Sequence, residues 1–300
     1  MSLKSVKLVS CLVFVSSSFS LWAGDRDVVY GEDNRVNLAE SKNELFKTVA
    51  RSTAGMIPND SIELKFEGIL ALLKAKTLQE SMNLCPGESF ADEVTAANCS
   101  GFLVGRDLLV TAGHCMRSES DCQNNKWVFD YRQDILSKGK EVYVSVANMY
   151  GCKKIVQQVL DSKTKNDFAL IQLDREVEDR EPLTFRIDDK IADDASLVVI
   201  GHPSGLPTKI ADGAKVRKND NNFFFVANLD TFGGNSGSAV FNAHTGLVEG
   251  ILVRGENDYE SDSVDEKNCM RVKRCAMDEC RGEDVQKIPP ILRYLRTGDY

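Results

Sequence analysis

Short apolar runs separated by turn residues dominate the chain from Cys99 onward, and they predict β-strands. Residues 101–104 and 108–111 are apolar and enclose a Gly-Arg-Asp turn, which is typical of a hairpin. Valine alternates with other residues over 142–147, as expected for a strand with one buried face. Further apolar runs cover residues 155–160, 168–173, 197–200, 223–227 and 247–253. Because no helical pattern alternates with these runs, they predict an all-β chain, as a barrel or a sandwich.

Before Cys99 the pattern is less regular. A weak helical stripe contains Leu38, Leu45, Phe46 and Val49. Apolar residues between positions 62 and 73 also recur at helical spacing, although strand alternation fits part of that stretch equally well. Both stripes are expected to pack in the core. The acidic segment 256–266 is predicted to be a solvated loop, because its Asp and Glu spacing matches no calcium-binding motif.

The first 23 residues have the three regions of a secretory signal peptide. Two lysines precede an apolar run from Leu8 to Trp22, and small residues follow it, so cleavage is expected after Ser20 or Ala23. The run is short and contains three consecutive serines, which disfavours a membrane anchor, and no later stretch is long enough to span a bilayer. We therefore expect a signal peptide over residues 1–23 and a propeptide or N-terminal arm over residues 24–49.

Cysteine usage agrees with secretion. Loss of the signal peptide removes one of the nine cysteines and leaves an even number, which indicates disulfides and a secreted or periplasmic location. Cys269, Cys275 and Cys280 are crowded, but they lack a Cys-x-x-Cys pair and a nearby histidine, so zinc is disfavoured. No metal or other cofactor is expected. The net charge of -8 and the pI of about 5.1 argue against nucleic-acid binding.

Three stretches carry residues suited to acyl transfer. Ser236 lies in a Gly-Gly-Asn-Ser-Gly-Ser run, where glycines allow a tight turn that directs backbone N–H groups towards one point. A serine nucleophile needs a base, and the base needs a partner that holds its tautomer. His114 ends one predicted strand and Asp167 precedes another, so both are candidates. His202, in a turn-rich loop, is the rival base, whereas His244 is predicted to lie in a hairpin turn.

The stretches around His114, Asp167 and Ser236 resemble those of the chymotrypsin-like (trypsin-fold) serine peptidases. The Gly-Asn-Ser-Gly-Ser form is most similar to the bacterial branch that includes the staphylococcal glutamyl endopeptidases. The similarity runs from about Ala50 to Gly255. It implies a peptidase domain over residues 50–300 with two six-stranded antiparallel β-barrels, the active site between them and room for a short C-terminal helix. It also implies protein or peptide substrates. The sequence does not determine the oligomeric state, for which a monomer is the expectation.

The resemblance assigns roles to individual residues. His114 becomes the general base and acid, Asp167 its orienting partner and Ser236 the nucleophile that forms an acyl-enzyme. The backbone N–H groups of Gly234 and Ser236 would form the oxyanion hole. A disulfide between Cys99 and Cys115 is also implied. The remaining pairings stay open, with Cys122–Cys152 as a first guess.

Substrate preference is expected to depend on Asp230, which precedes the nucleophile where trypsin-like members carry the carboxylate of the primary pocket. The other residues expected in the pocket are Thr231, Val253, Arg254 and Gly255. Gly255 would leave room for a long side chain, so cleavage after Arg or Lys is predicted. Arg254 complicates this prediction, because it would either neutralise Asp230 or attract an acidic substrate.

Cleavage after Glu is therefore the alternative. Glutamyl-specific members use a histidine on the pocket strand, where this chain has Leu252, together with a threonine that Thr231 matches. Asn235 replaces the aspartate that binds a newly freed N-terminus in animal digestive members, so that mode of activation is not expected. A non-catalytic binding homologue is the rival from another class. The presence of all three triad residues favours an enzyme.

Overall fold

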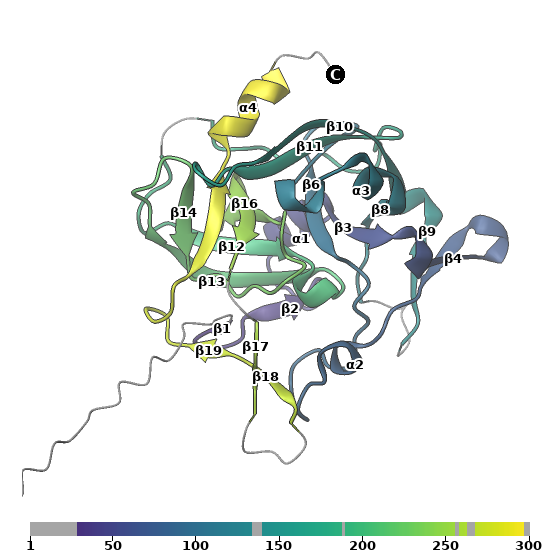
Figure 1. The fold of residues 1–300 in the computed structure, drawn as a ribbon, viewed down its shortest axis with the longest axis horizontal. Helices are drawn as coiled ribbons and strands as arrows, with labels where there is room; N and C mark the ends of the chain where they lie inside the picture. Colours follow the sequence, from purple (N-terminus) through teal and green to yellow (C-terminus); the bar gives the residue numbers. More distant parts are fainter. Residues whose placement is uncertain (1–28, 134–139, 188–189, 256–257, 263–267, 297–300) are drawn as a thin grey trace, which may run out of the picture.

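The computed structural model describes residues 29–133, 140–187, 190–255, 258–262 and 268–296 (Figure 1). The expected signal peptide lies outside these residues. Strands predominate, and they form two closed antiparallel barrels, which confirms the predicted all-β architecture. In the described part of the chain, no helix is long and apolar enough to cross a membrane.

The first barrel has the strand order β10-β11-β7-β6-β3-β8, and β8 pairs back onto β10. Its strands are β3 (Thr53–Pro58), β6 (Cys99–Leu103), β7 (Leu108–Thr111), β8 (Asn125–Phe129), β10 (Met149–Leu160) and β11 (Asp167–Leu173). The predicted hairpin is β6–β7, in which Gly101 lies opposite Thr111. Because Thr111 also lies opposite Ala169 of β11, the segment after β7 is placed beside the first residues of β11.

The second barrel has the order β12-β15-β16-β20-β14-β13, closed by pairing of β13 with β12. Its strands are β12 (Ser196–Gly201), β13 (Lys209–Lys218), β14 (Phe224–Ala227), β15 (Ala239–Asn242), β16 (Val248–Arg254) and β20 (Glu283–Lys287). Strand β2 (Arg35–Asn37) adds to β13, so part of the predicted N-terminal arm belongs to this sheet. The apolar pattern does not predict β20, whose residues are mostly polar, yet this strand closes the barrel between β14 and β16.

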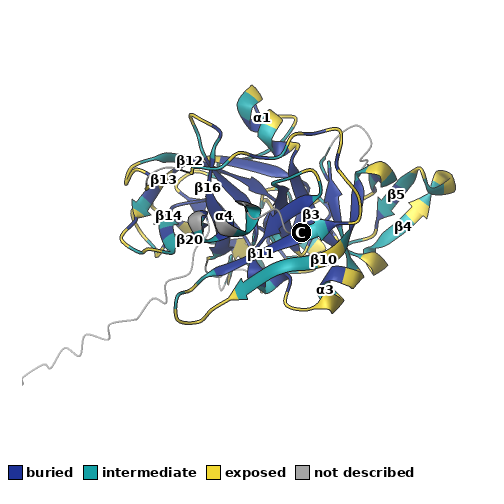
Figure 2. Ribbon diagram, turned by 90° about the horizontal axis from the view of Figure 1, so that it is seen from above, coloured by how far each residue is buried: buried dark blue, intermediate teal, exposed yellow. Residues whose placement is uncertain are grey.

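Several strands are buried on both faces (Figure 2). Along β12, Val198 and Ile200 belong to the apolar cluster that also fills the first barrel, whereas Leu197 and Val199 belong to the cluster inside the second barrel. Strand β16 repeats this arrangement. The unbroken apolar runs of the sequence therefore mark strands that are covered on both sides.

Three small sheets lie outside the barrels. In one of them β5 (Leu70–Leu73) lies between β4 (Ile62–Lys65) and β9 (Val142–Ser145). The other two pair β1 (Val29–Tyr30) with β19 (Arg274–Cys275), and β17 (Tyr259–Ser261) with β18 (Met270–Val272). The helical alternative for residues 62–73 is therefore wrong. The expectation that this stretch packs in the core is also partly wrong, because Phe66 and Ile69 are 65% and 67% exposed. They lie at the projecting turn of the β4–β5 hairpin, away from the barrels (Figure 1).

The helical segments are short. The α-helices are α1 (Glu44–Ala50), α2 (Leu78–Met82), α3 (Glu119–Asn124) and α4 (Pro289–Arg296). The 3-10 turns are η1 (Asn59–Ser61), η2 (Phe66–Gly68), η3 (Gly113–Cys115), η4 (Val146–Asn148) and η5 (Pro203–Gly205). Helix α1 contains most of the predicted N-terminal stripe, and the Asn43 side chain caps it by accepting from the N–H groups of Leu45 and Phe46. Helix α4 is the expected C-terminal helix.

Four disulfides cross-link the domain. Cys99–Cys115 is the pair implied by the resemblance, and Cys122–Cys152 agrees with the first guess. The other two pairs are Cys85–Cys269 and Cys275–Cys280. All three cysteines of the C-terminal group are therefore disulfide-bonded, which removes them as thiolate ligands for zinc.

Candidate active site

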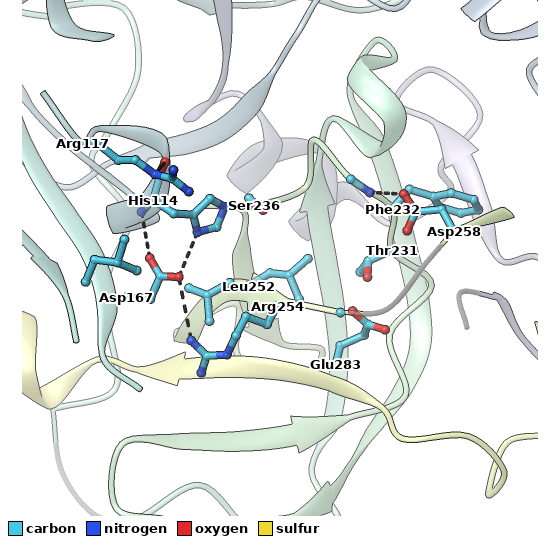
Figure 3. A pocket seen from close by; sticks show the side chains of 14 residues that line it. His114, Arg117, Asp167, Thr231, Phe232, Ser236, Leu252, Arg254, Asp258 and Glu283 are labelled. Atoms are coloured by element: carbon cyan, nitrogen blue, oxygen red, sulfur yellow. Dashed lines mark hydrogen bonds and ion pairs between the residues drawn. The ribbon is translucent and has the colours of Figure 1, made fainter. Parts of the chain in front are cut away.

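A cavity of about 430 Å³ is lined by residues of both barrels, and His114, Asp167 and Ser236 all contribute to it (Figure 3). His114 lies in η3, directly after β7, and Asp167 is the first residue of β11. The pairing of β7 with β11 therefore brings these two side chains together. Ser236 lies in the loop between β14 and β15 of the second barrel. The cavity thus unites the three residues that the sequence singles out.

Two hydrogen bonds join His114 to Asp167. The His114 backbone N–H donates to Asp167 Oδ1 at 3.0 Å, and His114 Nδ1 lies 2.9 Å from Asp167 Oδ2. Because a carboxylate only accepts hydrogen bonds, Nδ1 carries the proton and the lone pair is on Nε2. Ser236 lies on the side of the ring away from Asp167 (Figure 3). An imidazole held in this tautomer can take a proton from a neighbouring hydroxyl.

Asp167 is held by groups from the second barrel. It is 2% exposed, and its backbone N–H donates to Oε1 of the fully buried Gln286, 3.0 Å away. Gln286 Nε2 in turn donates to Asn166 Oδ1 at 3.0 Å. Arg254 Nη1 lies 3.8 Å from Asp167 Oδ2, while Arg254 Nε donates to Asp284 Oδ2 at 3.0 Å. Arg254 and the two hydrogen bonds with His114 offset the desolvation of the buried carboxylate, whereas Gln286 holds the backbone of Asp167.

The loop before Ser236 leaves two backbone donors available. Gly233 O accepts a hydrogen bond from the Ser204 N–H, so the N–H of Gly234, on the opposite side of the same trans peptide, points away from Ser204. Within the described residues, neither this N–H nor that of Ser236 has an acceptor. Gly234 has a φ of +91°, and a Cβ there would lie 2.7 Å from His202 O, so the turn requires glycine.

Ser100, a fully buried residue of β6, ties this loop to the first barrel. Its N–H donates to Ser236 O at 2.8 Å, and its Oγ donates to Gly234 O at 2.8 Å. The same Oγ accepts from the His202 N–H at 3.0 Å. One serine therefore sets the position of both available N–H groups across the interface between the barrels. The sequence pattern does not single it out.

Four of the five residues predicted for the substrate pocket line the cavity, namely Thr231, Val253, Arg254 and Gly255. Asp230 is not among the lining residues, which differs from the expectation. Its Oδ1 accepts from the Tyr30 N–H at 2.7 Å and its Oδ2 from the Asn34 N–H at 3.1 Å, so it faces the N-terminal arm. Burial raises the pKa of Asp230 to about 6, although these two donors lower it.

Two acidic residues that the sequence pattern does not single out line the cavity instead. Glu283, the first residue of β20, is 2% exposed. Asp258 accepts from the Gly233 N–H at 2.5 Å, and burial raises the pKa of Asp258 to about 7. Asp258 belongs to the segment predicted to be a solvated loop, whose described part, 258–262, contains β17. Residue type alone does not distinguish a buried acid from a solvated one.

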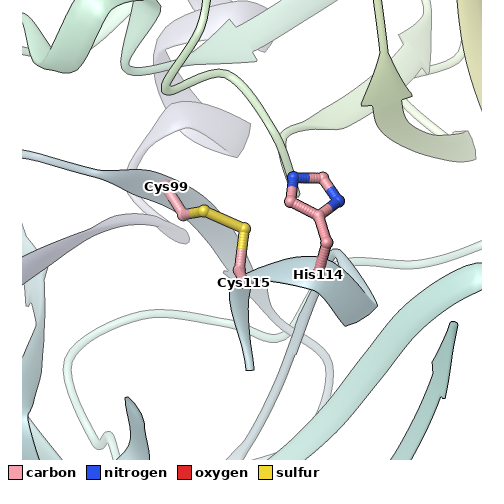
Figure 4. Close-up of side chains that lie close together, drawn as sticks. All are labelled: Cys99, His114 and Cys115. Carbon is pink, nitrogen blue, oxygen red and sulfur yellow. A yellow bond between two sulfur atoms is a disulfide. The ribbon is translucent and has the colours of Figure 1, made fainter. Parts of the chain in front are cut away.

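Cys99, His114 and Cys115 lie close together, with their potential ligand atoms within 4.8 Å of one another (Figure 4). Metal coordination requires thiolates, but these two sulfurs are joined in a disulfide. The cluster is therefore a cross-link that attaches the segment carrying His114 to strand β6.

The rival histidines lie outside the cavity. His202 is fully buried, stacks on Tyr131 with ring centroids 5.3 Å apart, and its Nδ1 lies 3.0 Å from Leu206 O. Burial lowers the pKa of His202 to about 4, which keeps the ring neutral. It is a packing residue in the turn that supports Gly234. His244 lies in the exposed turn between β15 and β16, as predicted.

Comparisons with known proteins identify the family and the fold. The sequence matches the family described as the trypsin-like peptidase domain over residues 99–251, about half of the chain. A structure of a Glu endopeptidase in complex with MPD has a TM-score of 0.52 and 16% identity, and the match covers 90% of this chain and 98% of that one. For a structure of the Vibrio cholerae VesB protease the TM-score is 0.51 and the identity 14%, and the match covers 89% of this chain and 66% of that one. No curated protein sequence matches the chain. On the strength of the family match, the chain belongs to the trypsin-like peptidase domain family.

Proposed function

We propose that the protein is a serine endopeptidase that cleaves peptide bonds through an acyl-enzyme. The observation that carries this proposal is the hydrogen-bonded His114–Asp167 pair, which shares one cavity with Ser236. Membership of the trypsin-like peptidase domain family supports it. The four disulfides support a secreted or periplasmic enzyme. Proteins or peptides are its substrates, and cleavage follows a basic residue.

The mechanism uses groups of this chain only. Ser236 Oγ attacks the carbonyl carbon of the scissile bond while its proton moves to His114 Nε2. The N–H groups of Gly234 and Ser236 donate to the oxyanion of the tetrahedral intermediate. His114 then protonates the leaving amine, the C–N bond breaks and the acyl-enzyme remains. Water, deprotonated by His114, attacks the ester and releases Ser236. Asp167 holds the imidazole in the required tautomer and stabilises its cation.

Residues 29–49 act in this proposal as an arm that remains with the domain. Strand β2 extends the second barrel, strand β1 pairs with β19, and the Asp230 carboxylate accepts from two N–H groups of the arm. An arm held by this many backbone hydrogen bonds is part of the folded unit and is costly to remove.

Replacement of Ser236 tests the proposal. The Ser236→Ala variant should fold normally and lose on the order of 10⁶-fold in kcat, because the nucleophile is absent. His114→Ala should lose activity to a similar extent, whereas His244→Ala, in an exposed turn, should retain it. Hydrolysis of a peptide library and labelling of Ser236 by a fluorophosphonate are the readouts. Undiminished turnover by Ser236→Ala contradicts the proposal, and so does a wild-type protein that is neither labelled nor active.

A further inference from the structure

The arrangement of charge in the cavity points to a residue that selects the substrate. The two lining arginines lie at the end that holds His114 and Asp167 (Figure 3). Arg117 Nε donates to His114 O at 3.0 Å. Arg254 interacts with Asp284 and Asp167, and its Nη1 also donates to a backbone carbonyl. Both cations therefore lie beside the His114–Asp167 pair, at the end of the cavity away from Glu283.

The opposite end of the cavity is acidic. Glu283 and Asp258 lie there with the Thr231 hydroxyl between them (Figure 3). A largely buried pocket end lined by two carboxyl groups disfavours an acidic side chain and can pair with a cationic one, and the exclusion of water strengthens that attraction.

Gly255 explains how Glu283 reaches the cavity. Arg254 of β16 lies opposite Asp284 of β20, so the next residue along β16, Gly255, lies beside Glu283. A Cβ on Gly255 would lie 1.8 Å from Glu283 Oε2. The carboxylate therefore occupies the space that the absent side chain of Gly255 leaves open. Any larger residue at position 255 has to displace it.

Asp230 is not in a position to compete for this role. Both of its oxygens accept from the N-terminal arm, and it does not line the cavity. We propose that Glu283 is the specificity-determining residue, and that it binds the guanidinium or ammonium group of the side chain preceding the scissile bond. This inference rests on the proposed peptidase function of the same site.

A matched pair of peptides tests the inference. The two substrates differ only in arginine or citrulline before the cleaved bond, so they have the same shape and differ in charge. The wild-type enzyme should cleave the arginine peptide with the higher kcat/KM. In Glu283→Gln, the ratio of arginine to citrulline cleavage should fall about ten- to hundredfold, because a charge-assisted hydrogen bond is lost while the volume is retained.

Two further variants keep the test decisive if Glu283→Gln folds poorly. Gly255→Ala should lower the same ratio, because its methyl group displaces the Glu283 carboxylate. Asp230→Asn is the matched control and should leave the ratio unchanged, because Asp230 faces the arm. A ratio that persists in Glu283→Gln or Gly255→Ala, or that falls in Asp230→Asn, overturns the inference.

The controls separate this inference from the proposed function. A wild-type protein that is labelled by a fluorophosphonate on Ser236 but cleaves both peptides equally contradicts the role of Glu283 alone. The same conclusion follows if a peptide library shows cleavage after Glu. A wild-type protein that is neither labelled nor active refutes the peptidase function, and the inference falls with it.

Discussion

The two ends of the active-site cavity are built in different ways. At the end proposed to be catalytic, His114 follows β7 and Asp167 begins β11, so the pairing of these two strands is enough to bring the two residues together. At the pocket end, the lining residues come from the loop before Ser236, the segment that follows β16 and the start of β20, namely Thr231, Gly255, Asp258 and Glu283. Gly255 and Glu283 meet because β20 pairs with β16, whereas Asp258 is placed by accepting from the Gly233 N–H.

This difference separates reaction chemistry from substrate choice. The proposed catalytic end combines the strand pairing that joins His114 to Asp167 with the loop of the second barrel that carries Ser236. The pocket end depends on barrel closure and on which face of each segment is turned inward. Changes at the first end should therefore act mainly on kcat. Changes at the second should act on the relative rates with different substrates. Three variants test this contrast, in addition to those described above.

The largest effect is expected from Asp167→Asn. The amide of the variant either donates an N–H to His114 Nδ1, which forces the ring proton onto Nε2, or makes no hydrogen bond with the ring. In both cases the imidazole is no longer held with its lone pair towards Ser236. We expect kcat to fall about 10⁴-fold with the cavity shape retained. Steady-state kinetics give the measurement, and Asp174→Asn, near the other end of β11, is the control. A loss below tenfold would show that Asp167 does not orient the base.

A smaller effect is expected from Ser100→Ala, which tests whether the contact between the barrels fixes the turn that contains Gly234. The variant removes the Oγ hydrogen bonds to Gly234 O and the His202 N–H and keeps the backbone bond to Ser236 O. We expect kcat to fall about tenfold, since one oxyanion donor loses its fixed position, while KM changes little.

Thr111→Val is the control for Ser100→Ala. It removes a buried hydrogen bond to Ser100 O without touching the Gly234 turn. Both variants should lose on the order of 1–3 kcal/mol in free energy of unfolding. Only Ser100→Ala should lose kcat. If the two variants have equal kcat, Ser100 has a purely structural role.

The smallest effect is expected from Asp258→Asn, and it depends on pH. Burial raises the pKa of Asp258 to about 7, so the pocket gains a second negative charge as the pH rises through 7. In the wild type, the ratio of arginine to citrulline cleavage should rise a few-fold from pH 6 to pH 8, on the order of 1 kcal/mol or less. Effects of pH that are common to both peptides cancel in this ratio. The variant should show no rise.

Stability supplies a second readout for Asp258. Its pKa is raised above the value of 3.8 for an unperturbed carboxyl group, so the folded state binds the proton more tightly between about pH 4 and pH 7. The contribution of Asp258 to the free energy of unfolding therefore falls as the pH rises across this window, and the full penalty is present above pH 7. The neighbouring charge of Arg35 reduces the shift without reversing it. The free energy of unfolding of Asp258→Asn, measured in urea, should not show this fall with pH. An identical pH dependence in the wild type and the variant would contradict this prediction.

Most of the barrel framework follows from the apolar pattern. Runs such as 197–200 form strands that are covered on both faces. Every residue of this run is apolar, so the strand can be recognised from the sequence. Strand β20 has no such run. Three of its residues are polar but buried. Glu283 lines the cavity, Asp284 accepts from Arg254, and Gln286 accepts from the backbone N–H of Asp167. A polar pentapeptide of this kind does not differ from a surface segment when read along the chain.

The sequence by itself determined the fold class and the chemistry expected of the site, because period-two alternation and a His-Asp-Ser order with a glycine turn are readable along the chain. Only the tertiary structure decided which acid faces the cavity. Asp230 and Glu283 are both buried carboxylates, but Asp230 accepts from the N-terminal arm while Glu283 stands over Gly255 in the pocket. The physical reason is that side-chain direction depends on strand register and barrel closure, which join residues separated by most of the domain.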